Sequence, residues 1–255
     1  MELTNKIRKE TKELAERKHR KRTGLFKCEG SKCILDIFNN FELKYLFATD
    51  DWIQSHADVA KRAGEKLFIC RRADIVEISS LSTPADVIAV FHTPETILDL
   101  DSLRGKLTLA LDGVQDPGNV GTIIRLADWF GVENVLCSLN TADVFSPKAL
   151  QSTMGAISKV KVFYCNLLET LGTLSSTENL FGTFLNGESI YASQLPSSGV
   201  IIMGNEGNGI SVNVASLVTH RLLIPSFANG NQSSESLNVA TATAITLSEF
   251  RRQNM

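Results

Sequence analysis

The sequence predicts an α/β fold in two domains, a small N-terminal α/β domain over residues 1–95 and a parallel-sheet domain over residues 105–255. Helical and strand patterns alternate along the chain, which is typical of α/β proteins. The length of 255 residues is more than a single domain usually needs. Residues 93–106 combine a proline and charges with no clear period, so they are expected to link the two domains.

In the N-terminal domain, short apolar strands alternate with helical patterns. A strongly basic helix is expected over residues 4–22, with Ile7 and Leu14 on its apolar side. The elements expected after it are a strand and helix within 23–40, a strand over 44–51, a helix over 51–64, a strand over 65–72, a helix over 73–81 and a strand over 86–92.

In the C-terminal domain, the strands are almost entirely apolar. Strands of this kind, separated by helices, indicate a parallel sheet that is covered on both faces. Strands are expected over 106–114, 132–138, 160–166, 180–186, 199–204 and 220–226. Helices are expected over 119–131, 146–157, 214–218 and 236–253, the second with Pro147 in its first turn.

The composition excludes several classes of protein. Hydrophobic residues make up 43% and charged residues 21%, as in ordinary globular proteins. No apolar run approaches the length that spans a bilayer, and the charged N-terminus lacks the apolar stretch of a secretory signal, so a cytoplasmic protein is expected. The five cysteines form no CxxC pair and the four histidines have no metal-ligand spacing, so no metal site is expected.

The charge is unevenly distributed. The net charge is −2, but residues 1–27 hold ten Lys or Arg and four Glu, for +6, and the remainder carries −8. A basic segment on an acidic body suits a polyanionic partner such as RNA. A solvated helix without a ligand would have the same charge pattern, so charge alone leaves both readings open.

The first of three polar loops at predicted strand ends covers residues 112–125. Two glycines and a proline make a tight turn that leads into a helix. Asn119 lies at the helix start, where its side chain could cap the helix or hold a substrate. Arg125 follows about a turn and a half later. A plain turn with a solvated Arg125 is the structural alternative.

The second loop covers residues 203–211 and has three glycines in six positions, which allow a ligand to approach the backbone closely. The glycine order differs from GxGxxG, and the chain contains no Gly-Lys-Ser/Thr. These absences argue against dehydrogenases and nucleotide hydrolases. A flexible turn is the alternative, although Glu206 among the glycines favours a site.

The third loop runs from Ile224 to Asn238. A predicted strand ends at Pro225, and Ser236 and Asn238 begin the last helix. Both residue types are common helix caps, which is the alternative to a role in a site. Because ligands bind at the carboxyl ends of strands in open α/β sheets, the three loops together predict one site.

The segments DGVQDPGNVGTIIRLAD, IIMGNEGNGIS and IPS…ESLNVATATAI resemble, in this order, the three motifs of the SpoU (TrmH-like) RNA 2′-O-ribose methyltransferases of the SPOUT class. Upstream, RKHRKRTGLFKCEG resembles the start of the L30e-like substrate-binding domain of many members that act on rRNA. The chain departs from the pattern in a longer loop over 226–235, and in KCEG, where an apolar residue commonly precedes Glu-Gly.

The resemblance implies a deep trefoil knot in the C-terminal domain, a homodimer whose active sites draw on both subunits, and S-adenosylmethionine held in a bent form by the three loops. It places five residues at the cofactor: Met203, Gly204, Gly209, Ile224 and Leu237. It implies a catalytic set of Arg125, Asn119, Glu206, Ser236 and Asn238.

The expected reaction is methyl transfer to a ribose 2′-hydroxyl of structured RNA, with rRNA the first expectation and tRNA the second. Since a guanidinium stays protonated, Arg125 is expected to grip a phosphate while the other four residues orient the hydroxyl and the loops. Proton removal is open between Glu206, a phosphate oxygen and water. Two further alternatives are a non-catalytic RNA-binding protein on the same fold and a small-molecule enzyme on a doubly wound sheet.

Overall fold

The computed structural model describes residues 3–228 and 236–255, and the chain forms two compact units. The first unit comprises Met1–Glu95 and Asp143–Ser158, and the second comprises Thr96–Ala142 and Lys159–Met255. A separate N-terminal α/β unit and a six-stranded parallel sheet confirm the predicted fold class.

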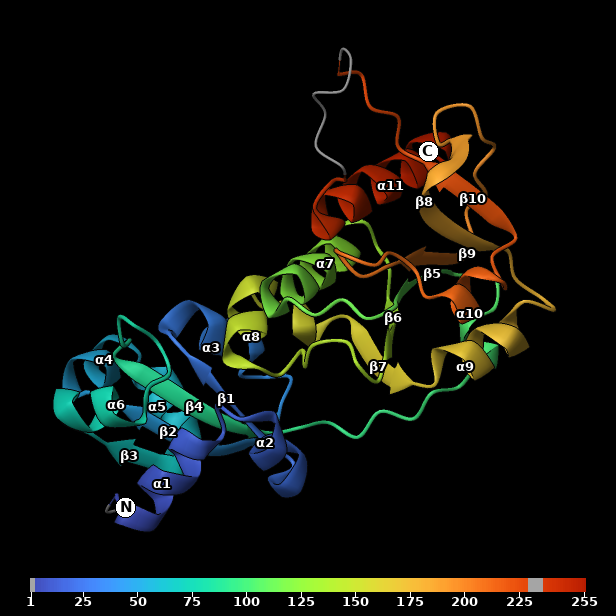
Figure 1. The fold of residues 1–255 in the computed structure, drawn as a ribbon. Helices are drawn as coiled ribbons and strands as arrows, with labels where there is room; N and C mark the ends of the chain where they lie inside the picture. The colour runs from blue at the N-terminus through green and yellow to red at the C-terminus, as the bar shows by residue number, and fades with distance from the viewer. Residues whose placement is uncertain (1–2, 229–235) are drawn as a thin grey trace. The chain divides into compact units, whose positions relative to one another are not determined.

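The first unit contains a four-stranded sheet in the order β1-β4-β2-β3 (Figure 1). Strand β4 is antiparallel to β1 and β2, and β2 is parallel to β3. Its elements are α1 Asn5–Glu13, α2 Arg17–Thr23, β1 Leu25–Glu29, α3 Ser31–Ile37, β2 Leu43–Ala48, α4 Asp50–Ser55, α5 Ala57–Ala63, β3 Leu67–Ile69, α6 Arg72–Ile78, β4 Val87–His92 and α8 Pro147–Thr153.

Two predicted helices of this unit are interrupted. The basic helix expected over 4–22 is α1 and α2, because the Arg20 guanidinium folds back and donates to the carbonyls of Leu14 and Ala15 just beyond the end of α1. The helix expected over 51–64 is α4 and α5, with His56 between them in a non-helical conformation. In both places a side chain satisfies a carbonyl that a continuous helix would have used.

The N-terminal segment is part of the packed unit. Leu14 is only 3% exposed and belongs to a buried cluster with Phe47 and Phe68. Arg20 is 5% exposed, and its Nε and second amino nitrogen bind Asp143 Oδ2 at 2.9 and 2.8 Å. Asp143 precedes α8, so this buried ion pair joins two distant parts of the sequence within the first unit.

The segment over 143–158 lies inside the C-terminal domain that the sequence predicts, but it packs with the first unit. The rings of Phe145 and Phe26 lie 4.7 Å apart, and α8 contacts β1. The helix expected over 146–157 ends at Thr153, because Met154 takes a left-handed conformation with φ 49°. The boundaries 1–95 and 105–255 otherwise stay predictions.

The second unit contains six parallel strands in the order β10-β8-β9-β5-β6-β7. Its elements are β5 Leu107–Leu111, α7 Pro117–Trp129, β6 Asn134–Ser138, β7 Lys161–Cys165, α9 Leu167–Leu174, β8 Leu180–Ser189, β9 Gly199–Met203, α10 Val212–Ala215, β10 His220–Leu223 and α11 Val239–Gln253. No helix among the described residues is long and apolar enough to cross a membrane.

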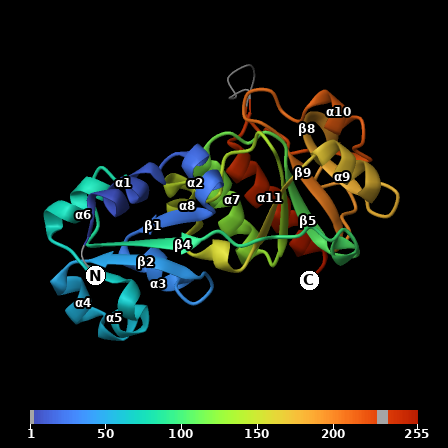
Figure 2. The same ribbon diagram turned by 90° about the horizontal axis from the view of Figure 1, so that it is seen from below.

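Helices cover both faces of this sheet (Figures 1 and 2). Ala110, Leu136 and Ile202 form a buried cluster with residues of α9 and α10. The alternate strand residues point to the other face, where Phe181 meets Phe250 of α11 edge-on and α11 packs on α7. The sequence therefore predicts the layers correctly, while the knot stays a prediction.

Two parts of the second unit differ from the sequence prediction. The linker expected over 93–106 is mostly exposed but is anchored by its leucines, because Leu103 is buried in the core cluster with Leu98 and Leu100 against it. Helix α9 was not expected, although Leu167, Leu171 and Leu174 follow a helical period and bury one face. Asn166 at the N-cap position is a common helix-start residue, but its side chain makes no capping bond here.

We predict that Arg20→Met destabilises the first unit by about 3 kcal/mol, because Asp143 and two carbonyls lose a largely buried partner. Lys21→Met is the matched control, since Lys21 is an exposed neighbour on the same helix. Urea unfolding followed by far-ultraviolet circular dichroism measures the effect. Equal stabilities of the two variants would contradict the structural role of Arg20.

Candidate functional site

The site begins where β5 and β9 end side by side. Leu111 of β5 pairs with Met203 of β9 in the parallel register. The residues that follow the two strands therefore emerge at the same edge of the sheet. This is the edge at which open α/β sheets bind ligands.

The loop after β5 leads into α7 through a side-chain cap. Asp116 is the N-cap and its carboxylate accepts from the backbone N–H of Asn119 at 2.9 Å, with Pro117 at the first helical position. The expectation that Asn119 could cap the helix is therefore wrong. Since Asp116 satisfies the helix end, the Asn119 side chain is available to the site.

The loop after β9 is shaped by Asn205. Its Oδ1 accepts from the backbone N–H groups of Gly207 and Asn208, and its backbone forms a bridge with Gly209, which has φ +67°. Its Nδ2 donates to the carbonyl of Gly113 at 2.8 Å, which joins this loop to the one after β5. Asn205 was not among the predicted site residues, although an Asn before Gly-x-Gly is a common turn signal.

A second bond joins the same two loops. The largely buried Asp112 carboxylate accepts from the backbone N–H of Ser211 at 2.8 Å. The backbone at Gly204 also approaches the backbone at Gly209 and Ile210 closely, because a Cβ on Gly204 would lie 2.3 Å from the Gly209 carbonyl carbon and from the Ile210 nitrogen. Gly204 therefore allows a contact that any side chain would prevent.

Three predicted catalytic residues from the three loops form one hydrogen-bonded chain. Asn238 caps α11, with Oδ1 accepting from two backbone N–H groups, so its Nδ2 is the atom that donates to Asn119 Oδ1 at 3.0 Å. Asn119 Nδ2 then donates to Glu206 Oε1 at 2.9 Å. The capping interpretation of Asn238 is confirmed, and because its second amide atom is left to bind Asn119, the predicted role in the site stays a prediction that is compatible with the cap.

The second and third loops border a cavity of about 510 Å³. All five residues expected at the cofactor line it, as do Glu206 and Ser236. The complete lining is Thr183, Phe184, Leu185, Met203, Gly204, Asn205, Glu206, Gly207, Asn208, Gly209, Ile210, Leu223, Ile224, Ser236, Leu237, Val239 and Ala242. Part of the long loop singled out in the sequence, residues 229–235, lies outside the described residues.

One wall of the cavity comes from an irregularity in β8 that the sequence prediction missed. The β8–β10 register jumps from Arg221↔Gly182 to Leu222↔Glu188, so residues 183–187 bulge out of the pairing. Arg221 holds the bulge, with its guanidinium carbon 3.5 Å from the centre of the Phe184 ring and an amino group 2.8 Å from Asn186 Oδ1. The sequence signal for this bulge was the pair Gly182 and Gly187, because glycines inside a strand often mark a bulge.

Arg125 is not part of this cluster. It is exposed on α7 beside the buried Ile123 and Ile124, it does not line the cavity, and it makes no hydrogen bond or ion pair with any residue in the described ranges. Its guanidinium is therefore available to a group outside the described chain. The same ranges hold no group of His, Cys, Asp and Glu that could bind a metal ion.

Comparison with known families agrees with this geometry. Residues 106–248, more than half of the chain, match the SpoU rRNA Methylase family. The chain belongs to the SpoU rRNA methylase family. Residues 5–89 match the MRM3-like substrate binding domain, which confirms the resemblance that the motifs suggested.

Individual SpoU relatives match along nearly the whole chain. The chain is 29% identical over 246 residues to the 23S rRNA (guanosine(2553)-2′-O)-methyltransferase RlmP of Bacillus subtilis, with 95% of each protein covered. A protein from Porphyromonas gingivalis described as an RNA methyltransferase of the TrmH family has 37% identity and a TM-score of 0.86, with 99% of this chain and 100% of that chain covered. The AdoMet-bound rRNA methyltransferase from Sinorhizobium meliloti has 29% identity and a TM-score of 0.85, with 100% and 97% covered.

We predict that Asn119→Asp lowers the free energy of unfolding by about 1–2 kcal/mol at neutral pH, because the new carboxylate cannot donate to Glu206 and repels it. Glu206→Gln is the control, since its amide oxygen can still accept from Asn119. The deficit of Asn119→Asp should shrink as the pH falls, because a proton shared by the two carboxyls restores a donor. Urea unfolding between pH 5 and pH 8 measures this, and a pH-independent deficit would contradict the geometry.

Proposed function

We propose that this protein transfers a methyl group from S-adenosylmethionine to a ribose 2′-hydroxyl of ribosomal RNA. The observation that carries the proposal is the cavity at the ends of β9 and β10, because residues of the second and third family motifs line it and Asn119 of the first motif is hydrogen-bonded to Glu206 in its wall. Relatives named 23S rRNA 2′-O-methyltransferases and an AdoMet-bound homologue of the same length support it.

The residues around the cavity fit S-adenosylmethionine. The cavity volume is within the range of small-molecule sites. Met203, Ile210 and Leu237 supply apolar surface, while the close backbone at Gly204 leaves peptide groups accessible. Met203, Gly204, Gly209, Ile224 and Leu237 would hold the cofactor, which supplies the electrophilic methyl group when bound.

The role of the chain is then to position the ribose hydroxyl. One oxygen of Glu206 is held by Asn119, and the other makes no bond with a described residue. The free oxygen can accept the hydroxyl hydrogen bond, with Ser236 close by in the lining of the same cavity. The candidates for removing the proton are Glu206, a phosphate oxygen of the substrate and water.

Arg125 is proposed to grip a phosphate of the RNA. Its guanidinium is exposed and unpaired among the described residues, which a substrate-binding group requires. A planar fork with several donors suits a phosphate. Arg125 does not line the cavity of its own subunit. The proposal therefore includes a homodimer, in which each active site also draws on residues of the second subunit.

The proposed substrate is rRNA, and tRNA is the second candidate. The N-terminal unit favours rRNA, because residues 5–89 match a substrate binding domain and RlmP, a relative matched over 95% of both chains, is named a 23S rRNA methyltransferase. An enzyme that modifies ribosomal RNA would work in the cytoplasm, which is part of the proposal.

We predict that wild-type protein binds S-adenosylmethionine without added metal, and that Gly204→Ala loses at least tenfold in affinity because its Cβ overlaps the Gly209–Ile210 backbone. Gly207→Ala is the matched control in the same loop, because its Cβ would meet nothing closer than 3.6 Å. Isothermal titration calorimetry measures both. Absence of binding by the wild-type protein would refute the proposed function.

We predict that Arg125→Ala abolishes methyl transfer while cofactor binding and thermal stability stay unchanged, because the exposed side chain makes no hydrogen bond or ion pair with the described residues. Arg125→Lys should remain impaired, since it keeps the charge and loses the planar fork. The assay is transfer of tritiated methyl to rRNA between pH 6 and pH 10. Activity of the lysine variant that rises steeply with pH would instead identify this side chain as the base.

A further inference from the structure

The buried Arg20 anchors helix α2 to the rest of the first unit. Arg20 Nη1 donates to the carbonyls of Leu14 at 2.8 Å and Ala15 at 2.7 Å, and the rest of its guanidinium binds Asp143. Gly24 ends the helix in the left-handed conformation with φ +63°. The side of α2 that carries Arg20 is therefore fixed within the first unit.

The opposite side of α2 carries three exposed cations. Lys18, Lys21 and Arg22 lie at positions i, i+3 and i+4, which share one face of a helix. Lys18 and Lys21 have no ion pair or hydrogen bond with any residue in the described ranges. The Arg22 side chain is 63% exposed, with one amino group 2.8 Å from His19 Nδ1 and 3.8 Å from Glu13. We call these three residues the α2 face.

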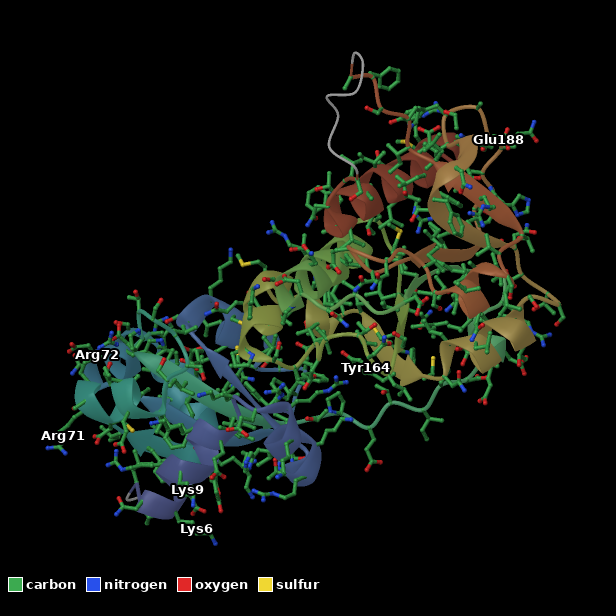
Figure 3. All side chains as sticks on the ribbon, in the orientation of Figure 1. Lys6, Lys9, Arg71, Arg72, Tyr164 and Glu188 are labelled. Atoms are coloured by element: carbon green, nitrogen blue, oxygen red, sulfur yellow. The ribbon has the colours of Figure 1, made fainter. Side chains whose placement is uncertain are left out.

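The neighbouring helix α1 is as rich in lysine, but most of its charge is compensated. Lys6 pairs with Glu10 at 4.0 Å and Lys9 with Glu13 at 3.9 Å, and both lysines point outward (Figure 3). Arg8 pairs with Asp74 at 2.8 Å, and this hydrogen bond lowers the pKa of the Asp74 carboxyl. Lys12 is the one cation of α1 without an ion pair or hydrogen bond among the described residues, whereas α2 has two, Lys18 and Lys21, so the uncompensated positive charge of the segment is larger on α2.

We propose that the α2 face binds the phosphate backbone of the RNA substrate, with Arg20 as the buried residue that positions it. This inference rests on the proposed function and adds the surface that holds the RNA. Lysine ammonium groups bind phosphates as point charges and read no bases, so the face would contribute affinity rather than sequence selection. Because the helix is already fixed, binding requires little further ordering of the backbone.

Two triple variants of the full chain test the α2 face. The first is Lys18→Gln/Lys21→Gln/Arg22→Gln, and the matched control Lys6→Gln/Lys9→Gln/Lys12→Gln removes the same charge from α1. Filter binding to transcribed 23S-type rRNA gives Kd between 50 and 200 mM KCl. The α2 variant should lower the slope of log Kd against log salt by about two and weaken binding at least tenfold at low salt, because two to three phosphate contacts are lost. The α1 variant should change the slope by less than about one.

A kinetic measurement separates this surface from the catalytic site. The α2 variant should raise the KM for rRNA and leave kcat and the calorimetric Kd for S-adenosylmethionine unchanged. Equal slopes for the two variants, with wild-type protein binding and methylating rRNA, would overturn the α2 face and leave the proposed function standing. Wild-type protein that neither binds rRNA nor transfers methyl would refute both. Salt-dependent binding of the α2 face to an acidic polypeptide but not to rRNA would assign it to a protein partner instead.

Discussion

The arrangement of the site depends on the parallel pairing of β5 with β9. This register places Asp112 and Gly113 beside the loop that follows Met203, so short bonds can join the two loops: Asn205 to the Gly113 carbonyl and Asp112 to the Ser211 amide. Each bond uses one side chain against backbone, which fixes the loops without restricting what lies in the cavity. The SpoU motifs are thus brought together by the sheet and then joined to one another by these hydrogen bonds.

The polar residues of the cluster hold both a helix end and the loops around the cavity. Asn238 caps α11 with one amide atom and holds Asn119 with the other, and Asn119 in turn holds Glu206. The backbone N–H groups at the start of α11 fix the Asn238 oxygen as an acceptor, so each amide nitrogen along these hydrogen bonds is a donor. Glu206 is therefore the final acceptor. The start of α11 and Glu206 are therefore linked through two amide side chains.

In the first unit, most of the basic residues near the N-terminus have structural partners. Arg20 holds the junction of α1 and α2, and Arg8 holds α1 to Asp74 of α6. Removing the whole segment would also remove Leu14 from the core, so its charge and its packing cannot be separated by truncation. Only point substitutions on the exposed side of α2 distinguish an RNA surface from a folding element.

The sequence by itself determined the α/β class, the layers of the parallel sheet and the three loops of the site, because apolar periodicity and glycine spacing are local properties. It did not determine the break between α1 and α2, the bulge of β8 over 183–187, or the identity of the cap of α7. Each of these depends on a partner distant in sequence or on a choice between two equally good polar residues, as between Asp116 and Asn119. Only the tertiary structure decides such choices, because it alone brings Asp143 to Arg20, Arg221 to Phe184 and Glu206 to Asn119.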